Sequence, residues 1–177
     1  MKFLMCTIAI RYWTARARAM KPKVGEQAPA FTVKAVGQGY EEGAEVSLAD
    51  LKGKPVVLVF YPKDNTPGCV IQACAIRDSW QDLKDLAHVF GVSVDDEKSH
   101  QNFIDKKELP YPLLADTEKE LVQSYGVWVE KNMFGKKYMG IERSSFIIDA
   151  DGKIHDVLEK VKPAKHIDQL LESLQNL

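Results

Sequence analysis

The sequence predicts a single α/β domain, a central sheet with helices packed against it. Short apolar runs rich in β-branched residues alternate with segments of helical periodicity, as in layered α/β domains. A chain of 177 residues is long enough to bury one sizeable core. Its composition, 45% hydrophobic and 28% charged, is ordinary for a soluble globular protein. We therefore expect one layered domain without repeats, linkers or low-complexity tracts.

Charge, cysteine content and hydropathy argue against several classes of function. The formal net charge is −1, which gives no reason to expect nucleic acid as a partner. Three cysteines are too few for a secreted disulfide scaffold and suit a reducing compartment, so we expect a cytoplasmic protein. No apolar run approaches the roughly 18 residues of a membrane span, so we expect no membrane partner.

The N-terminal segment differs from the rest and is treated as an extension, 1–20, ahead of a domain at 21–177. It contains no acid, several basic residues and a short apolar run at 3–10. Three interpretations stay open: translation that really begins at Met20, a targeting segment for export or an organelle, and a structural role. We expect no function for Cys6, which lies in this segment.

The domain opens with two short strands ahead of the central strand. The expected elements are, in order, a strand at 31–36, a glycine-rich turn at 37–43, a short strand at 45–48 and a turn at 49–53. Leu51 is expected to anchor this last turn to the core. These elements form a hairpin-like entry into the sheet.

The central strand leads directly to a cysteine. Residues 56–60, VVLVF, are apolar and mostly β-branched, which predicts a strand buried on both faces. After a polar turn, Thr66 is a good N-cap, Pro67 suits the first helical position, and Gly68 lets backbone approach closely. Cys69 therefore falls in the first helical turn, where unpaired N–H groups and the helix dipole favour the nucleophilic thiolate. We interpret the stretch as a reactive-cysteine site.

A second cysteine, Cys74, lies five residues further along the same predicted helix. Residues at this spacing in an intact helix are roughly 8–9 Å apart between Cα atoms and about 140° apart around the axis. A disulfide needs Cα atoms within about 7 Å and Cβ vectors that converge. A bond between Cys69 and Cys74 therefore requires local unwinding. The alternative is that both thiols simply pack as small hydrophobic groups.

The second half of the chain continues the alternation. The cysteine helix is expected to run on through Trp80, Leu83 and Leu86, which recur at helical spacing and predict core contacts. The remaining expected elements are strand 89–94, helix 99–107, a proline loop around 110–112, a short edge strand at 113–116, helix 118–125, a strand opening at 126–128, a solvated basic hairpin at 131–137, a buried strand at 144–149, an Asp-Gly turn at 151–152, strand 153–160 and an amphipathic helix at 164–174.

Polar residues outside the cysteine helix do not by themselves define a second site. Asp95 and Asp96 end the strand at 89–94 with no third ligand in view, so we interpret them as a solvated turn that caps the next helix. Arg143 precedes a buried strand, where the residues alone suggest a surface ion pair. The four histidines are scattered and are interpreted as structural or surface residues: His88, His100, His155 and His166.

The cysteine segment resembles a known family. Pro62-x-x-x-Thr66-x-x-Cys69 matches the active-site pattern of the peroxiredoxins. The longer stretch YPKDNTPGC at 61–69, with Cys74 and then Arg77-Asp78, is similar to the bacterioferritin comigratory protein (peroxiredoxin Q) branch. The resemblance extends from about Lys23 to the C-terminus and implies a thioredoxin-like fold with a central mixed sheet. One departure is Val70, where many relatives carry a hydroxyl residue, and we expect it to affect local polarity only.

The resemblance implies a role for five residues in a thiol-dependent peroxidase. Cys69 would attack a peroxide and become a sulfenic acid, and Cys74 would resolve it as an intramolecular disulfide. Thr66 would hydrogen-bond the peroxide, and Pro62 would shield the sulfenate from water and bulk oxidant. Arg143 would reach the sulfur, a role that suits a permanently charged guanidinium.

The resemblance also implies partners. Hydrogen peroxide and organic hydroperoxides would be the substrates, thioredoxin or a similar dithiol the reductant, and antioxidant defence and redox homeostasis the cellular role. No metal, haem or flavin is required. Because the resolving cysteine lies in the same chain, a dimer is not needed for the chemistry, and we expect a monomer.

Two other functions stay open from the residues. A general thiol–disulfide oxidoreductase on the same fold is disfavoured because the helix start lacks C-x-x-C. A non-catalytic redox sensor or partner-binding module would use Cys69 and Cys74 as a switch that changes a surface. Such a protein would oxidise once and would show no sustained peroxide consumption.

Overall fold

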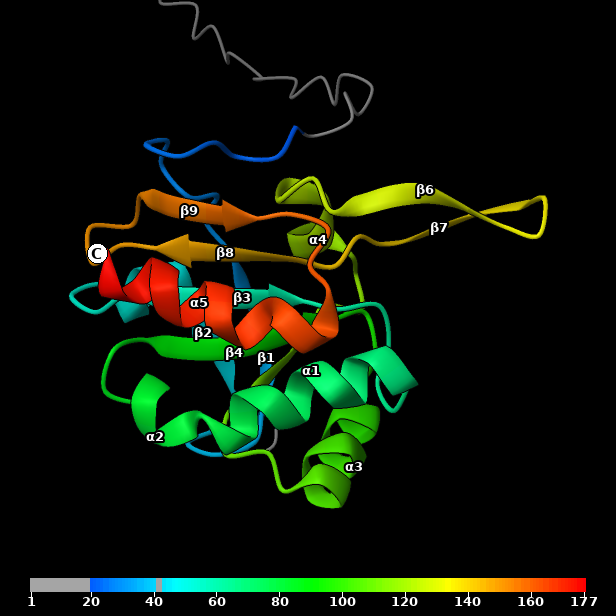
Figure 1. Ribbon diagram of the computed structural model, residues 1–177, viewed down its shortest axis with the longest axis horizontal. Helices are drawn as coiled ribbons and strands as arrows, with labels where there is room; N and C mark the ends of the chain where they lie inside the picture. The colour runs from blue at the N-terminus through cyan, green and yellow to red at the C-terminus, as the bar shows by residue number, and fades with distance from the viewer. Residues whose placement is uncertain (1–19, 41–42) are drawn as a thin grey trace, which may run out of the picture.

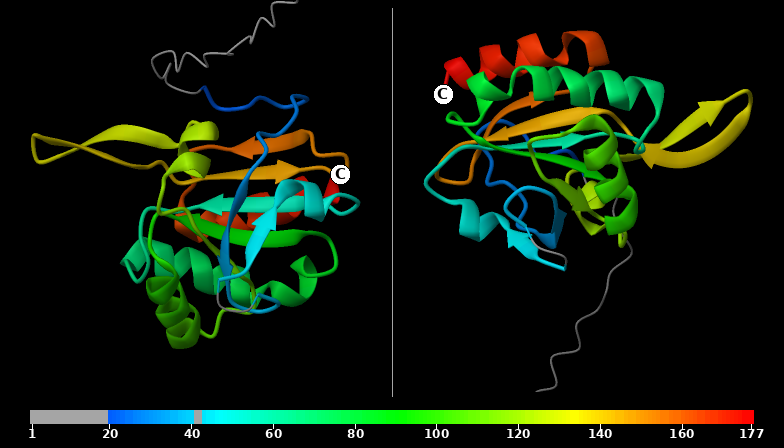
Figure 2. Two further views of the ribbon diagram at one scale, coloured as in Figure 1. Left: turned by 180° about the vertical axis from the view of Figure 1, so that it is seen from behind. Right: turned by 90° about the horizontal axis from the view of Figure 1, so that it is seen from below.

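The computed structural model describes residues 20–40 and 43–177. Residues 1–19, which include Cys6 and nearly all of the proposed extension, lie outside the described residues, as do residues 41–42 of the glycine-rich turn. The expected α/β architecture is confirmed, because a mixed sheet forms the centre and helices pack against it (Figures 1 and 2). No helix within the described ranges is long and apolar enough to cross a membrane.

The main sheet contains seven strands in the order β2-β1-β5-β4-β3-β8-β9. Their bounds are β1 Thr32–Val36, β2 Glu45–Ser47, β3 Val56–Phe60, β4 His88–Ser93, β5 Leu113–Ala115, β8 Ser144–Ile148 and β9 Ile154–Leu158. A separate two-stranded ribbon pairs β6, Trp128–Met133, with β7, Lys136–Ile141, and projects from the body of the molecule (Figure 1). The predicted solvated hairpin is thus confirmed, and Phe134 at its tip is 99% exposed.

The helices cover both faces of this sheet. They are α1 Pro67–Asp78, α2 Trp80–Leu83, α3 Glu97–Lys107, α4 Glu120–Ser124 and α5 His166–Gln175, with short 3₁₀ helices η1 Leu48–Leu51 and η2 Pro163–Lys165. Helices α1 and α5 lie side by side on one face (Figures 1 and 2). Side chains of α4 and η1 belong to the core on the other face.

Strand β3 is the centre of the fold. All of its side chains are at most 2% exposed, so the prediction of a strand buried on both faces is confirmed. Val57 and Val59 contribute to the core beneath α1 and α5, whereas the alternate residues contribute to the opposite core, as the two-residue period of a strand requires. β3 pairs parallel with β4 and antiparallel with β8, which places Phe60 opposite Ser144. The loop after β3 therefore meets the residue that precedes β8.

Two predictions about the middle of the chain are wrong. The cysteine helix does not run on unbroken: α1 ends at Asp78, Ser79 interrupts it, and α2 is a separate short helix. Leu83 is buried as predicted, but Leu86 lies beyond α2 and is 42% exposed. Helical spacing in the sequence continued across a break that the backbone makes at Ser79.

The position predicted for the strand at 113–116 is also wrong. β5 is not an edge strand, because it pairs antiparallel with β1 and parallel with β4 inside the sheet. Its shortness suggested an edge, yet all three of its residues are buried. Which strands flank it depends on pairings between distant parts of the chain, and local sequence does not encode those.

Candidate active site

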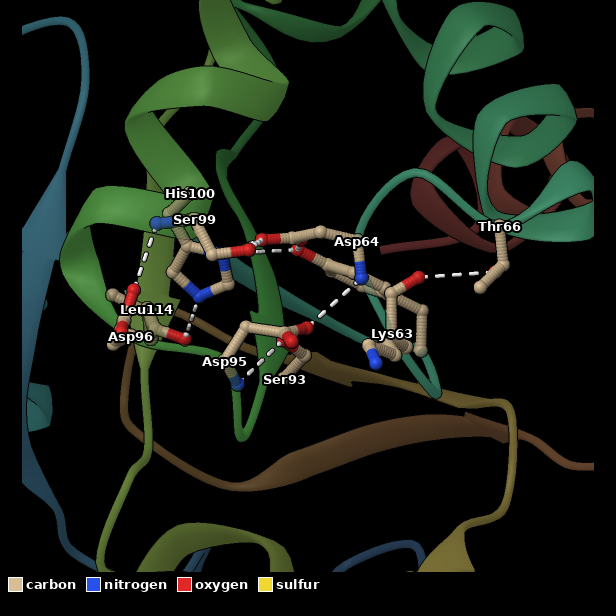
Figure 3. Close-up of polar contacts among 10 residues, drawn as sticks. Lys63, Asp64, Thr66, Ser93, Asp95, Asp96, Ser99, His100 and Leu114 are labelled. Carbon is tan, nitrogen blue, oxygen red and sulfur yellow. Dashed lines mark hydrogen bonds and ion pairs between the residues drawn. The ribbon is translucent and has the colours of Figure 1, made fainter.

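Helix α1 begins where the sequence predicts, with Pro67 at its first position and Thr66 as N-cap. Thr66 has the extended backbone typical of an N-cap, but the expected side-chain cap is wrong: no helix N–H of the described chain bonds to its hydroxyl. The hydroxyl instead donates to the carbonyl of Lys63 at 3.0 Å (Figure 3). The first-turn N–H groups of α1 are therefore not occupied by the Thr66 side chain.

Cys69 lies in this first turn and is 2% exposed. The guanidinium of Arg143 contacts its sulfur, because Nη2 donates to Sγ at 3.4 Å. Gly68 makes this approach feasible, because a Cβ there would lie 3.2 Å from the same nitrogen. Val70 packs against the apolar cluster that contains Cys69. A thiol, a cation and the positive end of a helix thus meet at one point.

A further residue, Gln72, holds the arginine. Its Oε1 accepts a hydrogen bond from Arg143 Nη1, while Nη2 of the same guanidinium faces the sulfur. Gln72 is buried and neutral, so it orients the guanidinium without cancelling its charge. Sequence reasoning missed this residue. Its spacing of three from Cys69 would have placed both on one face of the helix.

The acid beside Arg143 is neutralised by a different cation. Glu142 pairs with Lys21, whose ammonium also lies 2.7 Å from Glu159. Glu142 thus pairs with Lys21, whereas the Arg143 guanidinium contacts Gln72 and Cys69. The predicted surface ion pair for Arg143 is therefore replaced by contacts with Gln72 and the thiol.

The charge of Arg143 contributes to lowering the pKa of two nearby basic groups, His166 and Lys131. Burial first, and then Arg143, lower the pKa of His166 to about 4, so this histidine is neutral at pH 7. Its Nε2 lies 2.8 Å from the hydroxyl of Ser145. Burial and Arg143 also lower the pKa of Lys131 on β6. For Lys131, Glu142 and Cys69 act in the opposite direction and raise the pKa.

Cys74 has different surroundings. It is partly buried in the middle of α1, and both cysteines of the described chain are free thiols. The helix is continuous from Pro67 to Asp78, so the two thiols are held apart as the i, i+5 argument requires. Around Cys74 the helix is tied to its neighbours: Tyr111 Oη donates to Ala73 O at 3.3 Å, and Arg77 Nη1 donates to Lys107 O at 2.8 Å.

The five predicted site residues are thus distributed unevenly. Cys69 and Arg143 are in contact, and Cys74 lies further along the same helix. Pro62 and Thr66 lie with partly exposed side chains in the loop between β3 and α1. Among the described residues, no cluster of three or more His, Cys, Asp or Glu side chains could hold a metal ion.

Sequence reasoning also missed a polar cluster beneath this loop. Asp64 and His100 are both buried and lie in contact, although the sequence suggested no partner for His100. Asp96 caps α3 by accepting from Ser99 N at 2.8 Å, as predicted (Figure 3). Asp95 differs from the predicted solvated turn, because its carboxylate accepts from the backbone of Asp64 at 2.9 Å.

Comparison with known proteins adds an independent line of support. A model of the AhpC/TSA family matches residues 24–157. A putative peroxiredoxin Bcp of Coxiella burnetii is 47% identical over 156 residues, which cover 88% of this chain and 100% of that protein. Peroxiredoxin Bcp of Bacillus subtilis is 42% identical over 159 residues, covering 89% of this chain and 98% of that protein.

Solved structures give the same picture. Peroxiredoxin Q of Xanthomonas campestris has a TM-score of 0.75 at 34% identity, over 82% of this chain and 90% of that one. A cysteine-to-serine mutant of PrxQ from Xylella fastidiosa has a TM-score of 0.81 at 29% identity, over 89% and 98% of the two chains. The X. campestris bacterioferritin comigratory protein, also at a TM-score of 0.75 and 33% identity over 82% and 90% of the chains, is described as reducing alkyl peroxides.

Proposed function

Since the chain belongs to the AhpC/TSA family and is a peroxiredoxin, a thiol peroxidase on a thioredoxin-like fold, we propose that Cys69 is its peroxidatic cysteine. The contact between Arg143 Nη2 and Cys69 Sγ carries this assignment. A thiolate beside a fixed cation and at a helix start is a reactive thiolate. Cys74, partly buried and without such a donor to its sulfur among the described residues, suits the second step.

In the first step the Cys69 thiolate attacks one oxygen of the peroxide. An S–O bond forms as the O–O bond breaks, sulfur is oxidised to the sulfenic acid, and the other oxygen leaves as water or an alcohol after it takes a proton. Arg143 and the N–H groups at the start of α1 stabilise the negative charge that moves to the leaving oxygen. Thr66 hydrogen-bonds the peroxide, and Pro62 shields the sulfur from water.

In the second step the Cys74 thiolate attacks the sulfur of the Cys69 sulfenic acid. The S–S bond forms as the S–O bond breaks, and the hydroxide that leaves takes up the proton released by the Cys74 thiol to give water, so that a disulfide forms within one chain. The wound helix α1 keeps the two sulfurs apart, so its first turns must open before this bond can form. A dithiol protein, thioredoxin by the family resemblance, then reduces the disulfide by exchange.

The substrates that suit this site are hydrogen peroxide and organic hydroperoxides. The alkyl peroxide reduction described for the X. campestris protein supports the organic class. An intramolecular disulfide needs no second subunit, which supports a monomer, and reduction by a dithiol supports a reducing, cytoplasmic setting. The role in the cell would be antioxidant defence and redox homeostasis.

The test is peroxide consumption by the purified chain with thioredoxin, thioredoxin reductase and NADPH, alongside its intact mass after one equivalent of peroxide. We expect sustained NADPH loss and a mass decrease of about 2 Da, from the two hydrogens lost as the disulfide forms. A disulfide that forms once without turnover would instead indicate a sensor or another reductant. A chain that peroxide does not oxidise would refute the assignment.

A further inference from the structure

The loop that precedes Cys69 is held from below by one buried carboxylate. Asp64, midway between Pro62 and Thr66, accepts a hydrogen bond from Tyr61 Oη at 2.6 Å. It also accepts from Ser99 Oγ at 2.7 Å, and its Oδ2 lies 2.8 Å from His100 Nδ1 (Figure 3). Ser99 and His100 belong to α3, far from the cysteine motif in sequence. The side chains of Asp64 and His100 are 1% and 0% exposed. A buried carboxylate with three side-chain partners holds its own residue, and hence this loop, in one position.

Both ring nitrogens of His100 lie within hydrogen-bond distance of a buried oxygen. Nε2 lies 3.0 Å from the carbonyl of Leu114, which can only accept, so this nitrogen carries a proton. Burial alone would raise the pKa of Asp64, but the hydrogen bond and charge of His100, with those from Tyr61 and Ser99, lower it below its ordinary value. Nδ1 lies 2.8 Å from Asp64 Oδ2, so both ring nitrogens have a buried hydrogen-bond partner and the ring is fixed between Asp64 and Leu114.

The same loop is fixed at its backbone. The N–H of Asp64 donates to Asp95 Oδ2 at 2.9 Å, and that oxygen also accepts from Ser93 Oγ at 2.7 Å (Figure 3). The Thr66 hydroxyl bonds to Lys63 O inside the loop. Side chain and backbone of one residue thus tie the loop to α3 and to the end of β4, and the tied residue lies between the two that would contact and shield the peroxide.

Tyr61 connects this cluster to the reactive sulfur. Its hydroxyl donates to Asp64, while its ring lines, with Cys69, a cavity of about 10 Å³. Gly91 on β4 gives the ring its room, because a Cβ there would lie 3.1 Å from Tyr61 Cε1. A shift of Asp64 would therefore be transmitted both to the loop that precedes Cys69 and to the ring that lines a cavity with it.

We propose that His100 is a positioning residue for the peroxidase reaction: it holds Asp64, and through Asp64 it fixes the loop bearing Pro62 and Thr66 against Cys69. The inference rests on the proposed function of Cys69 and adds to it a residue of α3. Misplacement of groups around a reacting atom slows the reaction even when the fold persists, since the rate depends on alignment. His100 acts on peroxide reduction, not on the nucleophilicity of the sulfur, which depends on Arg143 and the start of α1.

The test compares two reactions of Cys69 in the full chain, for wild type and His100→Gln. Oxidation by hydrogen peroxide depends on the loop, whereas alkylation by iodoacetamide needs only an accessible thiolate. Both rate constants are followed at the Cys69 peptide by mass spectrometry, at a temperature where circular dichroism shows each variant folded. We expect the oxidation constant to fall by about tenfold or more while the alkylation constant stays within about twofold.

A pair of matched tyrosine variants keeps the proposal testable if His100→Gln does not fold. Tyr61→Phe removes one buried hydroxyl from Asp64, and Tyr125→Phe removes another buried hydroxyl, which donates to Pro29 O at 3.0 Å on the other core. Tyr61→Phe should lower the ratio of the oxidation constant to the alkylation constant, and Tyr125→Phe should leave that ratio unchanged.

Two results would overturn the proposal. One is an unchanged ratio in both His100→Gln and Tyr61→Phe. The other is a parallel fall of both constants in His100→Gln, which would make His100 a general structural residue. Failure of peroxide to oxidise Cys69 in the wild type would instead overturn the proposed function, so the two failures are distinguishable.

Discussion

The two cysteines of α1 lie five residues apart on one helix but in different surroundings. Cys69 is buried in the first turn, and an arginine from the start of β8 donates to its sulfur. Cys74 is partly buried in the middle of the helix, where Arg77 turns to Asp78 and to the carbonyl of Lys107. Arg143 is directed at the sulfur of Cys69, whereas Arg77, three residues after Cys74, bonds to Asp78 and Lys107 instead.

In the proposed mechanism, this difference lets one helix support two steps of the reaction. The helix start and Arg143 place positive charge and hydrogen-bond donors beside the Cys69 sulfur, where the proposed attack on peroxide takes place. The second half of α1 is held to α3 and to Tyr111, so the opening that the proposed disulfide requires should fall in the first turns. On this proposal the two thiols are specialised by what packs on them, not by residue type.

The strongest test of this specialisation is Cys69→Ser. A serine hydroxyl is a poor nucleophile toward peroxide, so we expect peroxide consumption to fall to the reagent background. Peroxide loss in the thioredoxin-coupled assay measures it. Activity close to that of wild type would show that the other cysteine, or Cys6, is the nucleophile.

Cys74→Ser should separate the two steps. The first oxidation of Cys69 should proceed at a rate close to that of wild type, because Cys74 makes no contact with the peroxide in the proposed mechanism. Thioredoxin-linked turnover should stop, because no intramolecular disulfide forms. Single-turnover oxidation and NADPH consumption measure the two steps. Unchanged NADPH consumption would argue against a resolving role.

Arg143→Gln should remove the cation that distinguishes the surroundings of Cys69 from those of Cys74. We expect the rate constant for oxidation of Cys69 to fall by about 10²–10³-fold, as when one donor to a developing charge is removed. Arg77→Gln is the matched control, since it removes an arginine from the Cys74 half of the helix and should change this constant by less than about twofold. Equal effects of the two variants would refute a specific role for Arg143.

The smallest expected effect concerns stability against pH on the Cys69 side. The pKa of His166 is about 4 in the folded chain and about 6.5 when unfolded, so the unfolded chain binds more protons between these values. The contribution of His166 to the free energy of unfolding is complete above pH 6.5. As the pH falls toward 4, that free energy decreases by up to about 1.4 kcal/mol per pH unit. Because the pKa of Asp64 lies below its ordinary value, its carboxylate stabilises the folded chain until the pH falls below the range in which an ordinary aspartate is protonated.

Urea denaturation at pH 7 and pH 5 measures the His166 contribution. His166→Gln, which cannot titrate, should be less sensitive to this change of pH than wild type. If both chains lose the same free energy of unfolding over this interval, the histidine is not the group that titrates.

Much of the fold is encoded locally. The run at 56–60 predicts β3, and Thr66-Pro67 predicts the first residue of α1, because period, capping position and proline act within a few residues. Among the wrong predictions, those for Leu86 and β5 depend on a helix break and on strand order. These are decided by packing against distant elements, which a local pattern does not contain.

The chemical groups of this protein can be read from its amino acids: a thiol in a first helical turn, a second thiol too far away for a disulfide in a wound helix, and the family motif around them. The surroundings of the sulfur depend on how the whole chain folds. Arg143 reaches Cys69 across 74 residues because β8 pairs with β3, and His100 reaches Asp64 across 36 residues because α3 packs beneath the loop. Such contacts follow from strand pairing and helix packing over the whole chain, and no local spacing specifies them.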